Sequence, residues 1–157
     1  MPQALGLWER RAILSSATQP RWERVVFTVD SGASDTVVPP GVCSLAPLHH
    51  TEKVGTEYEV ANSAIITNLG ERRCLMRTSE KGAVLNMKWQ VVDVHKPLLS
   101  VGRMIDQGHE CIFKKDCAYI DLANGGGRLP LRKNGGVYEL EVWVRSPDSV
   151  SDFAGQR

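Results

Sequence analysis

The chain lacks a long hydrophobic run and a strong excess of charge of either sign. No stretch approaches the roughly 18 apolar residues that a membrane helix needs, and 19 basic residues against 18 acidic ones give a formal net charge of +1. That balance gives no reason to expect a nucleic-acid or membrane partner. Because Glu9, Arg10 and Arg11 interrupt the first stretch of the chain, no secretion signal is expected, and we predict an intracellular, cytoplasmic protein.

Cysteine is scarce, and its spacing fits no metal site. Cys43, Cys74, Cys111 and Cys117 could form two disulfides, but in an intracellular protein we expect free thiols. A structural zinc site needs ligands paired at short spacing, as in C-x2-C, and none of these cysteines has such a partner. We therefore predict no metal and no other cofactor.

Short apolar runs, separated by glycine, proline and polar turns, predict many strands and little helix. Residues 85–91 alternate between apolar and polar side chains, which predicts a strand with its odd positions in the core and Gln90 facing solvent. Another strand is expected over residues 73–78. Ser100 is a suitable N-cap, and Gly108 a suitable C-terminal stop, for the one helix that the pattern supports.

Together these elements predict an all-β fold, namely a small closed β-barrel with one short helix in the C-terminal half. At 157 residues the chain is long enough for one domain with its own core. We place this domain at residues 20–145. The polar stretches 1–19 and 146–157 are predicted to be a disordered N-terminal arm and a disordered tail.

The most informative motif is the run Asp30-Ser31-Gly32-Ala33-Ser34, which directly follows the apolar segment Val25–Val29. This order predicts that a buried strand delivers one carboxylate to a tight glycine turn, with a hydroxyl beside it. Such a turn suits a carboxylate that is held rigidly and partly removed from water. Asp-Ser-Gly alone is also a common turn sequence, so the motif becomes specific only together with the elements that come after it in the chain.

The full order of elements is a strand, an aspartate turn, a small-residue hairpin, an apolar pair, a helix and another strand. It resembles the retropepsin-like aspartic proteases, and most closely those of copia-type retrotransposon polyproteins. Copia-type proteases typically carry Asp-Ser-Gly-Ala-Ser, here residues 30–34, and an apolar pair followed by Ser-Val, here Leu98-Leu99-Ser100-Val101. A glycine and a short strand come next, here residues 108–113. The resemblance extends from Trp22 to Trp143.

The resemblance implies an aspartic endopeptidase that processes polyproteins as a homodimer. Each chain would contribute one catalytic carboxylate, Asp30, because the motif occurs only once. Ser31 would hydrogen-bond across the dimer, Gly32 would allow close backbone approach, and Ala33 would support the turn. The second apolar motif is formed by Leu98, Leu99 and Ser100 and leads into the helix. The expected partners are therefore a second copy of the chain and a peptide or polyprotein substrate.

The resemblance also implies that a hairpin covers the substrate as a flap. Its expected residues are Tyr58, Val60, Ala61, Asn62, Ser63 and Ala64. In copia-type relatives the tip often reads Gly-Asn-Gly or Gly-Asp-Gly, and the loss of both glycines restricts the backbone. An alternative is therefore a repurposed dimeric barrel that binds peptides without cutting them. An unrelated β-barrel binding module, which would be monomeric, is a third interpretation.

One further departure concerns an ion pair. In viral retropepsins the second apolar pair is usually followed by Gly-Arg, and the arginine pairs with an aspartate two residues after the turn glycine. Here Ser100 and Val101 stand at the positions of that Gly-Arg, and Ser34 stands at the position of the aspartate. The sequence therefore predicts that both halves of the pair are missing. Asp35, one residue further on, is expected to be a solvated turn residue.

Overall fold

The computed structural model describes residues 21–60 and 62–147, and strands are its main regular structure. Strands take up 47% and helices 7%, so the predicted all-β class is confirmed. The elements, in chain order, are β1 (Glu23–Asp30), β2 (Val37–Val38), β3 (Glu57–Glu59), β4 (Ile65–Thr67), β5 (Gly70–Arg77), β6 (Leu85–Val91), β7 (Leu98–Ser100), α2 (Val101–Asp106), β8 (Glu110–Phe113), β9 (Ala118–Asp121), the 3-10 turn η1 (Ala123–Gly125), β10 (Arg128–Asn134) and β11 (Val137–Arg145).

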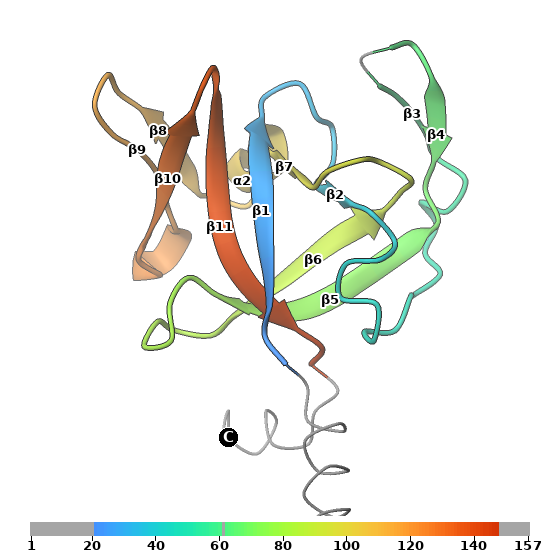
Figure 1. The fold of residues 1–157 in the computed structure, drawn as a ribbon, viewed down its shortest axis with the longest axis horizontal. Coiled ribbons are helices and arrows are strands. Elements are labelled where there is room, and N and C mark those ends of the chain that lie inside the picture. Colours follow the sequence, from blue (N-terminus) through green and yellow to red (C-terminus); the bar gives the residue numbers. More distant parts are fainter. Residues whose placement is uncertain (1–20, 61, 148–157) are drawn as a thin grey trace, which may run out of the picture.

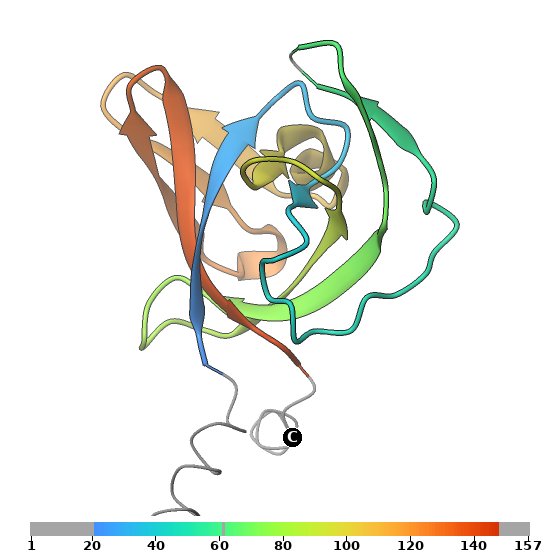
Figure 2. The same cartoon turned by 45° about the vertical axis from the view of Figure 1, so that its right-hand side comes forward.

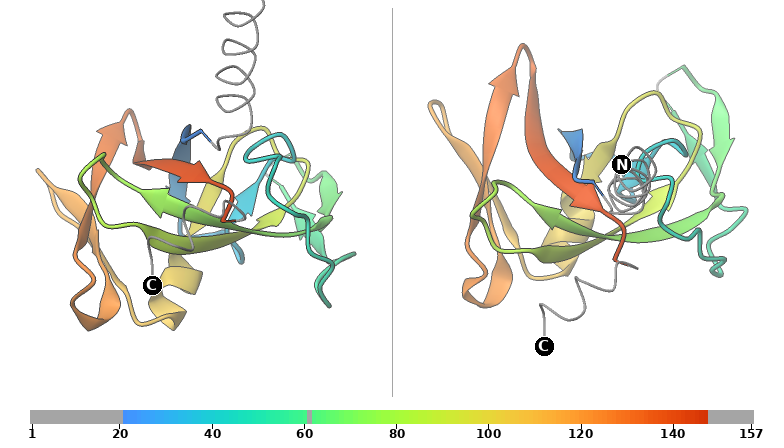
Figure 3. Two further views of the ribbon diagram at one scale, coloured as in Figure 1. Left: turned by 90° about the horizontal axis from the view of Figure 1, so that it is seen from below. Right: turned by 60° about the horizontal axis from the view of Figure 1, so that its bottom comes forward.

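The main sheet closes on itself. Its strand order is β1-β7-β2-β6-β5-β11-β10-β9-β8. Strand β1 also pairs with β11, which closes the first six strands of this order into a circle. Strands β1, β7, β2, β6, β5 and β11 therefore form a ring, from which β10, β9 and β8 extend to one side (Figure 1). The views from below show β5 and β6 crossing one side of this ring (Figure 3).

The interior of the ring is filled by the side chains that alternate inward along the long strands. Val25 and Phe27 of β1 are buried, as are Trp89 of β6 and Leu140 of β11. The rings of Phe27 and Trp89 lie 6.1 Å apart between centroids at 58°, a tilted arrangement that aromatic pairs favour. The core therefore fixes β1 firmly, and with it the position at which β1 ends.

A parallel pair of strands lies at the centre of the fold. Thr28, Val29 and Asp30 of β1 are in register with Leu98, Leu99 and Ser100 of β7. Parallel pairing brings the C-terminal ends of the two strands to the same side. The predicted aspartate turn and the predicted second apolar motif, far apart in sequence, are therefore neighbours in space (Figure 2).

Helix α2 begins directly after β7, as predicted. Ser100 has an extended backbone, and its hydroxyl accepts a hydrogen bond from the backbone N–H of Arg103 at 3.1 Å, which makes it the N-cap. The helix ends at Asp106 with Gln107 as its C-cap, and Gly108 follows with φ of +90°, a conformation that favours glycine. Both predicted boundaries of the helix are confirmed.

Two strand predictions need correction. Strand β5 begins at Gly70, three residues before the predicted start. Glycine suits this first position, because its φ is +148° and a Cβ would lie only 2.7 Å from the Leu48 side chain. Gln90 was expected to face solvent but is 4% exposed. Its amide is satisfied inside the protein by Asn68 and Glu71, which removes the cost of burying it.

The predicted arm 1–19 and residues 148–157 of the predicted tail lie outside the described residues. Ser146, at the start of the predicted tail, is buried, so the packed structure continues at least one residue beyond the predicted boundary at 145. No helix within residues 21–60 and 62–147 is long and apolar enough to cross a membrane.

Candidate active site

Asp30 is the last residue of β1 and is half-buried. Its Oδ1 accepts a hydrogen bond of 2.7 Å from the backbone N–H of Gly32. A Cβ on Gly32 would lie 3.3 Å from this oxygen, which is tighter than an ordinary contact, so glycine leaves room for the carboxylate to bend back over the turn. Ser31 is exposed next to it. The turn thus presents one oriented carboxylate at the protein surface.

Ser100 anchors this turn from the side of β7. Its hydroxyl donates a hydrogen bond of 2.7 Å to the carbonyl oxygen of Ala33, and its backbone N–H donates to Oγ1 of Thr36 at 3.1 Å. The Ser100 side chain is fully buried, and Leu99 before it is 1% exposed. The second apolar motif therefore supports the aspartate turn with packed side chains and two hydrogen bonds.

Replacing Ser100 by alanine is expected to lower the free energy of unfolding by about 2 kcal/mol, because one hydroxyl both caps α2 and satisfies the Ala33 carbonyl. Urea denaturation measures this loss. Ser34→Ala is the matched control, since Ser34 is exposed and its side chain makes no hydrogen bond among the described residues. If the two variants lose equal stability, the Ser100 hydroxyl does not anchor the turn.

The predicted hairpin is present and forms a sheet of its own from β3 and β4. It stands at the same end of the molecule as the turn after β1 (Figure 1, Figure 2). Beyond β3, the N–H of Val60 donates to the carbonyl of Ala64 at 3.0 Å, and Asn62 Oδ1 accepts from the N–H of Ala64 at 3.0 Å. Ser63 has φ of +62°, and Ala61 lies outside the described residues.

Tyr58 is the residue of the hairpin that ties it to the main body. Its side chain is half-buried, and its hydroxyl donates a hydrogen bond of 2.8 Å to Oδ2 of Asp35. At the base, the N–H of Gly55 donates to the carbonyl of Asn68 at 2.9 Å, and the N–H of Asn68 donates to the carbonyl of Thr56 at 2.8 Å. A lone two-stranded hairpin is marginally stable in water, so these attachments set where it stands.

Asp35 corrects two predictions. It is 7% exposed rather than solvated, and its Oδ1 accepts from Nζ of Lys53 at 2.9 Å and from Nε of Arg103 at 2.8 Å. Arg103 also donates to the carbonyl of Ser34 at 3.1 Å. A pair between the buried Asp35 and the exposed Arg103 is therefore present, contrary to the expectation that both halves were missing. Its two members are displaced along the chain from the positions that the pair usually takes in viral retropepsins.

A chain of hydrogen bonds continues from Asp35 into the core. The Tyr58 hydroxyl accepts from Nδ2 of Asn68 at 3.1 Å, and the same Nδ2 donates to Oε1 of Gln90 at 2.9 Å. Gln90 Nε2 then donates to Oε1 of Glu71 at 3.1 Å. Asn68, Gln90 and Glu71 are all buried. This cluster links the base of the hairpin, the loop after the Asp30 turn and the strands β5 and β6.

The charges of the cluster shift the pKa values of its acids. Burial alone would raise the pKa of the Asp35 carboxyl, but hydrogen bonds from Lys53 and Tyr58 outweigh it. The charges of Lys53 and Arg103 act in the same direction, so the pKa of Asp35 lies below its usual value. Burial would likewise raise the pKa of Glu71, yet its hydrogen bonds and nearby cations lower it. Asp35 and Glu71 are therefore ionised at neutral pH.

Sequence reasoning missed this polar cluster. Lys53, Asn68 and Glu71 carry no local signal, because their partners come from other strands and loops. Arg103 had one: it stands three residues after a strong N-cap, where its side chain points back toward the preceding turn. Within the described part of the chain, no three side chains of His, Cys, Asp or Glu come close enough to hold a metal ion.

Comparison with known proteins gives no family assignment: no protein-family model, curated protein or solved structure matches this chain. The functional interpretation accordingly depends on the geometry of the Asp30 turn, the hairpin and the Asp35 cluster.

Proposed function

We propose that this chain is one subunit of a homodimeric aspartic endopeptidase of the retropepsin-like, copia-type kind, with Asp30 as its catalytic residue. The ring of six strands is then the closed barrel of that fold, and polyprotein processing is its task. The observation that carries the proposal is the Asp30 turn and the hydrogen bonds that hold it. Asp30 ends a buried strand, its carboxylate is oriented by the N–H of Gly32, and the turn is held by Ser100 from the parallel strand β7.

In the proposed dimer the Asp30 carboxylates of the two subunits meet at a twofold axis. Two carboxylates that lie so close cannot both ionise cheaply, so they share one proton and titrate as a unit. One of them takes a proton from a bound water molecule, while the protonated one polarises the scissile carbonyl. Ser31, exposed beside Asp30, is suited to hydrogen-bond across the axis and keep the two turns in register.

The hairpin of β3 and β4 acts as the flap. It stands at the same end of the molecule as the Asp30 turn, and its tip is exposed while its base is fixed through Tyr58. A flap of this kind covers the extended peptide and excludes water from the reaction. Leu98 and Leu99 lie under the turn and give the carboxylate a rigid support.

Activity is expected to fall faster than protein concentration when the enzyme is diluted. Because each chain carries half of the site, the specific activity drops once the concentration passes below the dimer dissociation constant. Cleavage of a quenched fluorescent peptide, measured over about a 1,000-fold range of protein concentration, reports this dependence. A covalently linked tandem dimer is the control and should keep its specific activity throughout.

A specific activity that stays constant on dilution, together with a monomeric mass in sedimentation, would contradict the proposal. Inhibition by a peptide that carries a non-cleavable hydroxyl group at the scissile position is a second arm of the test. Such a group mimics the tetrahedral intermediate, which binds better than the substrate does.

One observation favours a second candidate function, a peptide-binding dimer that does not cut. Ser63 at the hairpin tip has φ of +62°, a conformation that costs less free energy for glycine than for serine. The tip sequence Ala61-Asn62-Ser63 contains no glycine. A stiffer flap would hold peptides without completing the catalytic geometry. Binding of the hydroxyl-containing inhibitor with no cleavage of the matching substrate would favour this candidate.

A further inference from the structure

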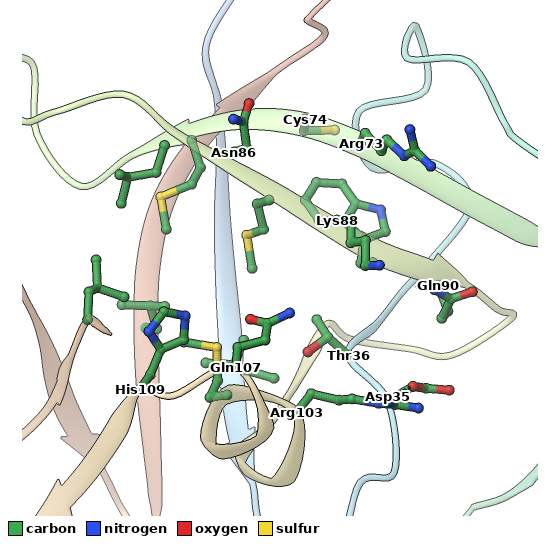
Figure 4. A pocket seen from close by; sticks show the side chains of 18 of the residues that line it. Asp35, Thr36, Arg73, Cys74, Asn86, Lys88, Gln90, Arg103, Gln107 and His109 are labelled. Atoms are coloured by element: carbon green, nitrogen blue, oxygen red, sulfur yellow. Dashed lines mark hydrogen bonds and ion pairs between the residues drawn. The ribbon is translucent and has the colours of Figure 1, made fainter. Parts of the chain in front are cut away.

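A cavity of about 850 Å³ lies between strand β6 and helix α2. The close view shows β6 along one side, and Arg103 and Gln107 from the region of α2 along the other (Figure 4). Asp30 does not line this cavity, whereas Asp35 lies at one end of it. It is therefore a site separate from the proposed catalytic turn, and its volume lies within the range of pockets that hold ligands.

Among the described residues, no strand lies beside the edge of β6 that faces the cavity over residues 85–89. Strand β2 pairs with β6 only at Gln90 and Val91, and no other described strand pairs with that edge. Because the N–H of Gln90 donates toward β2, at 2.9 Å to the carbonyl of Thr36, alternation along the strand turns the N–H and C=O of Asn86 and Lys88 the same way. Within residues 21–60 and 62–147, the backbone groups that these two residues direct toward the cavity have no hydrogen-bond partner.

A second, independent feature is a buried donor without an acceptor. Trp89 lines the cavity and is 1% exposed, and its Nε1 has no hydrogen-bond partner among the described residues. A buried N–H that stays unpaired costs free energy comparable to a lost hydrogen bond. An acceptor on a ligand would remove this cost if binding displaces the atoms that now cover Nε1.

The lining also defines the chemistry of the ligand. The inner part is apolar, with Met76, Leu85, Met87, Met104, Leu122 and Leu129. The remainder carries four Lys or Arg side chains and two carboxylates, but two of the four basic groups bind Asp35 and a third pairs with Glu71. The fourth basic residue, Lys88, is exposed and lies on β6 itself, within the unpaired edge.

The cavity and the unpaired edge of β6 together form a groove. We propose that this groove binds a separate peptide in extended conformation, which adds to β6 as a further strand. The unpaired groups of Asn86 and Lys88 supply the backbone hydrogen bonds, and the apolar part takes alternate side chains. Residues 85–89 span about 15 Å, at about 3.4 Å per residue, which matches a segment of roughly five residues. The charge of Lys88, which has no ion pair among the described residues, favours an acidic residue on that segment. The proposal stands whether or not Asp30 is catalytic.

The experiment uses the full chain with Asp30→Asn, so that no probe is cut, and the acetylated and amidated peptide Glu-Val-Thr-Leu-Thr-Val-Glu. Lys88→Pro removes an N–H that faces the groove and leaves the hydrogen bonds to β5 intact. It is expected to weaken binding by about tenfold. Lys88→Gln is the matched control; it loses the charge but keeps the N–H, and should weaken binding by only about threefold.

Two further measurements keep the test decisive if Lys88→Pro does not fold. Hydrogen exchange should show that the peptide protects the amides of Asn86 and Lys88. Two N-methylated peptides are compared, one methylated at the apolar residues and one at the threonines. Only one of them should lose binding, because the N–H groups of the two sets point to opposite edges of the added strand and only one edge pairs with β6. Equal effects of both methylations would mean apolar capture without strand pairing and would overturn the proposal.

Other occupants of the groove are distinguished in the same experiment. Protection of Asn86 and Lys88 without peptide, rising with protein concentration, would mean that a second copy fills the groove. Protection that is independent of concentration would mean that another segment of this chain fills it. Either result, or the absence of saturable binding at about 1 mM peptide, would overturn the proposal.

Discussion

Replacing Asp30 by asparagine is expected to lower peptide cleavage by about 10⁴-fold while leaving the fold intact. The loss is large because asparagine can neither accept a proton from water nor share one with the second carboxylate. The fold should survive because the amide oxygen of asparagine can still accept the 2.7 Å hydrogen bond from Gly32 and occupies nearly the same volume. Initial rates with a fluorescent peptide, with hydrogen exchange as a check on the fold, measure both effects.

Asp121→Asn is the control for this prediction. Asp121 is also a carboxylate in a hydrogen bond, with Arg128 at 2.7 Å, but it lies on β9, outside the ring that carries the Asp30 turn. Its replacement should leave cleavage unchanged. If Asp30→Asn hydrolyses peptides at the normal rate, Asp30 is not the catalytic carboxylate, and the proposed function loses its basis.

Local patterns predicted the parts of the site that are encoded within a few residues. The Asp30 turn, the hairpin and the N-cap at Ser100 each depend on neighbours in sequence: an apolar run before a glycine turn, two alternating segments, and a serine before a helix. Their mutual position was not predicted and follows from the pairing of the strands. Parallel pairing of β1 with β7 then brings Ser100 against the turn.

The errors have a common physical cause. Asp35 and Gln90 were assigned to solvent because polar side chains usually lie there, yet both are buried. What makes their burial possible is a set of partners 18 to 68 positions away, including Lys53 and Arg103. No local pattern announces such partners. The unpaired edge of β6 was equally invisible, since alternation identifies the two faces of a strand but not its two neighbours.

Replacing Asp35 by alanine is expected to lower the free energy of unfolding by about 2–3 kcal/mol at neutral pH. The cost lies below the range typical of a broken buried pair, because the Lys53 and Arg103 side chains, at 39% and 46% exposure, can reach water once the carboxylate is gone. Urea denaturation measures the difference. Asp121→Ala, which removes a carboxylate from an exposed pair, should change stability little.

The difference in the free energy of unfolding between wild type and Asp35→Ala should also depend on pH. Because the folded-state pKa of Asp35 is depressed, its contribution is fully present above the unfolded value, about 3.9, and is lost as the pH falls through the folded value. The gap between wild type and Asp35→Ala should therefore be constant from neutral pH to about pH 5 and shrink below about pH 4. Glu71 titrates in the same acidic range in both proteins, so its effect cancels in the difference.

Asp35 should also control the hairpin, which a purely local stability effect would not do. Tyr58→Phe keeps the ring but removes the 2.8 Å hydrogen bond to Asp35, so it and Asp35→Ala should both speed amide exchange in β3 and β4. Exchange in β8 and β9 should change only to the extent that global stability falls. If Tyr58→Phe leaves β3 and β4 as protected as before, the buried carboxylate does not hold the hairpin, which is then fixed by its backbone attachments at Gly55 and Asn68 instead.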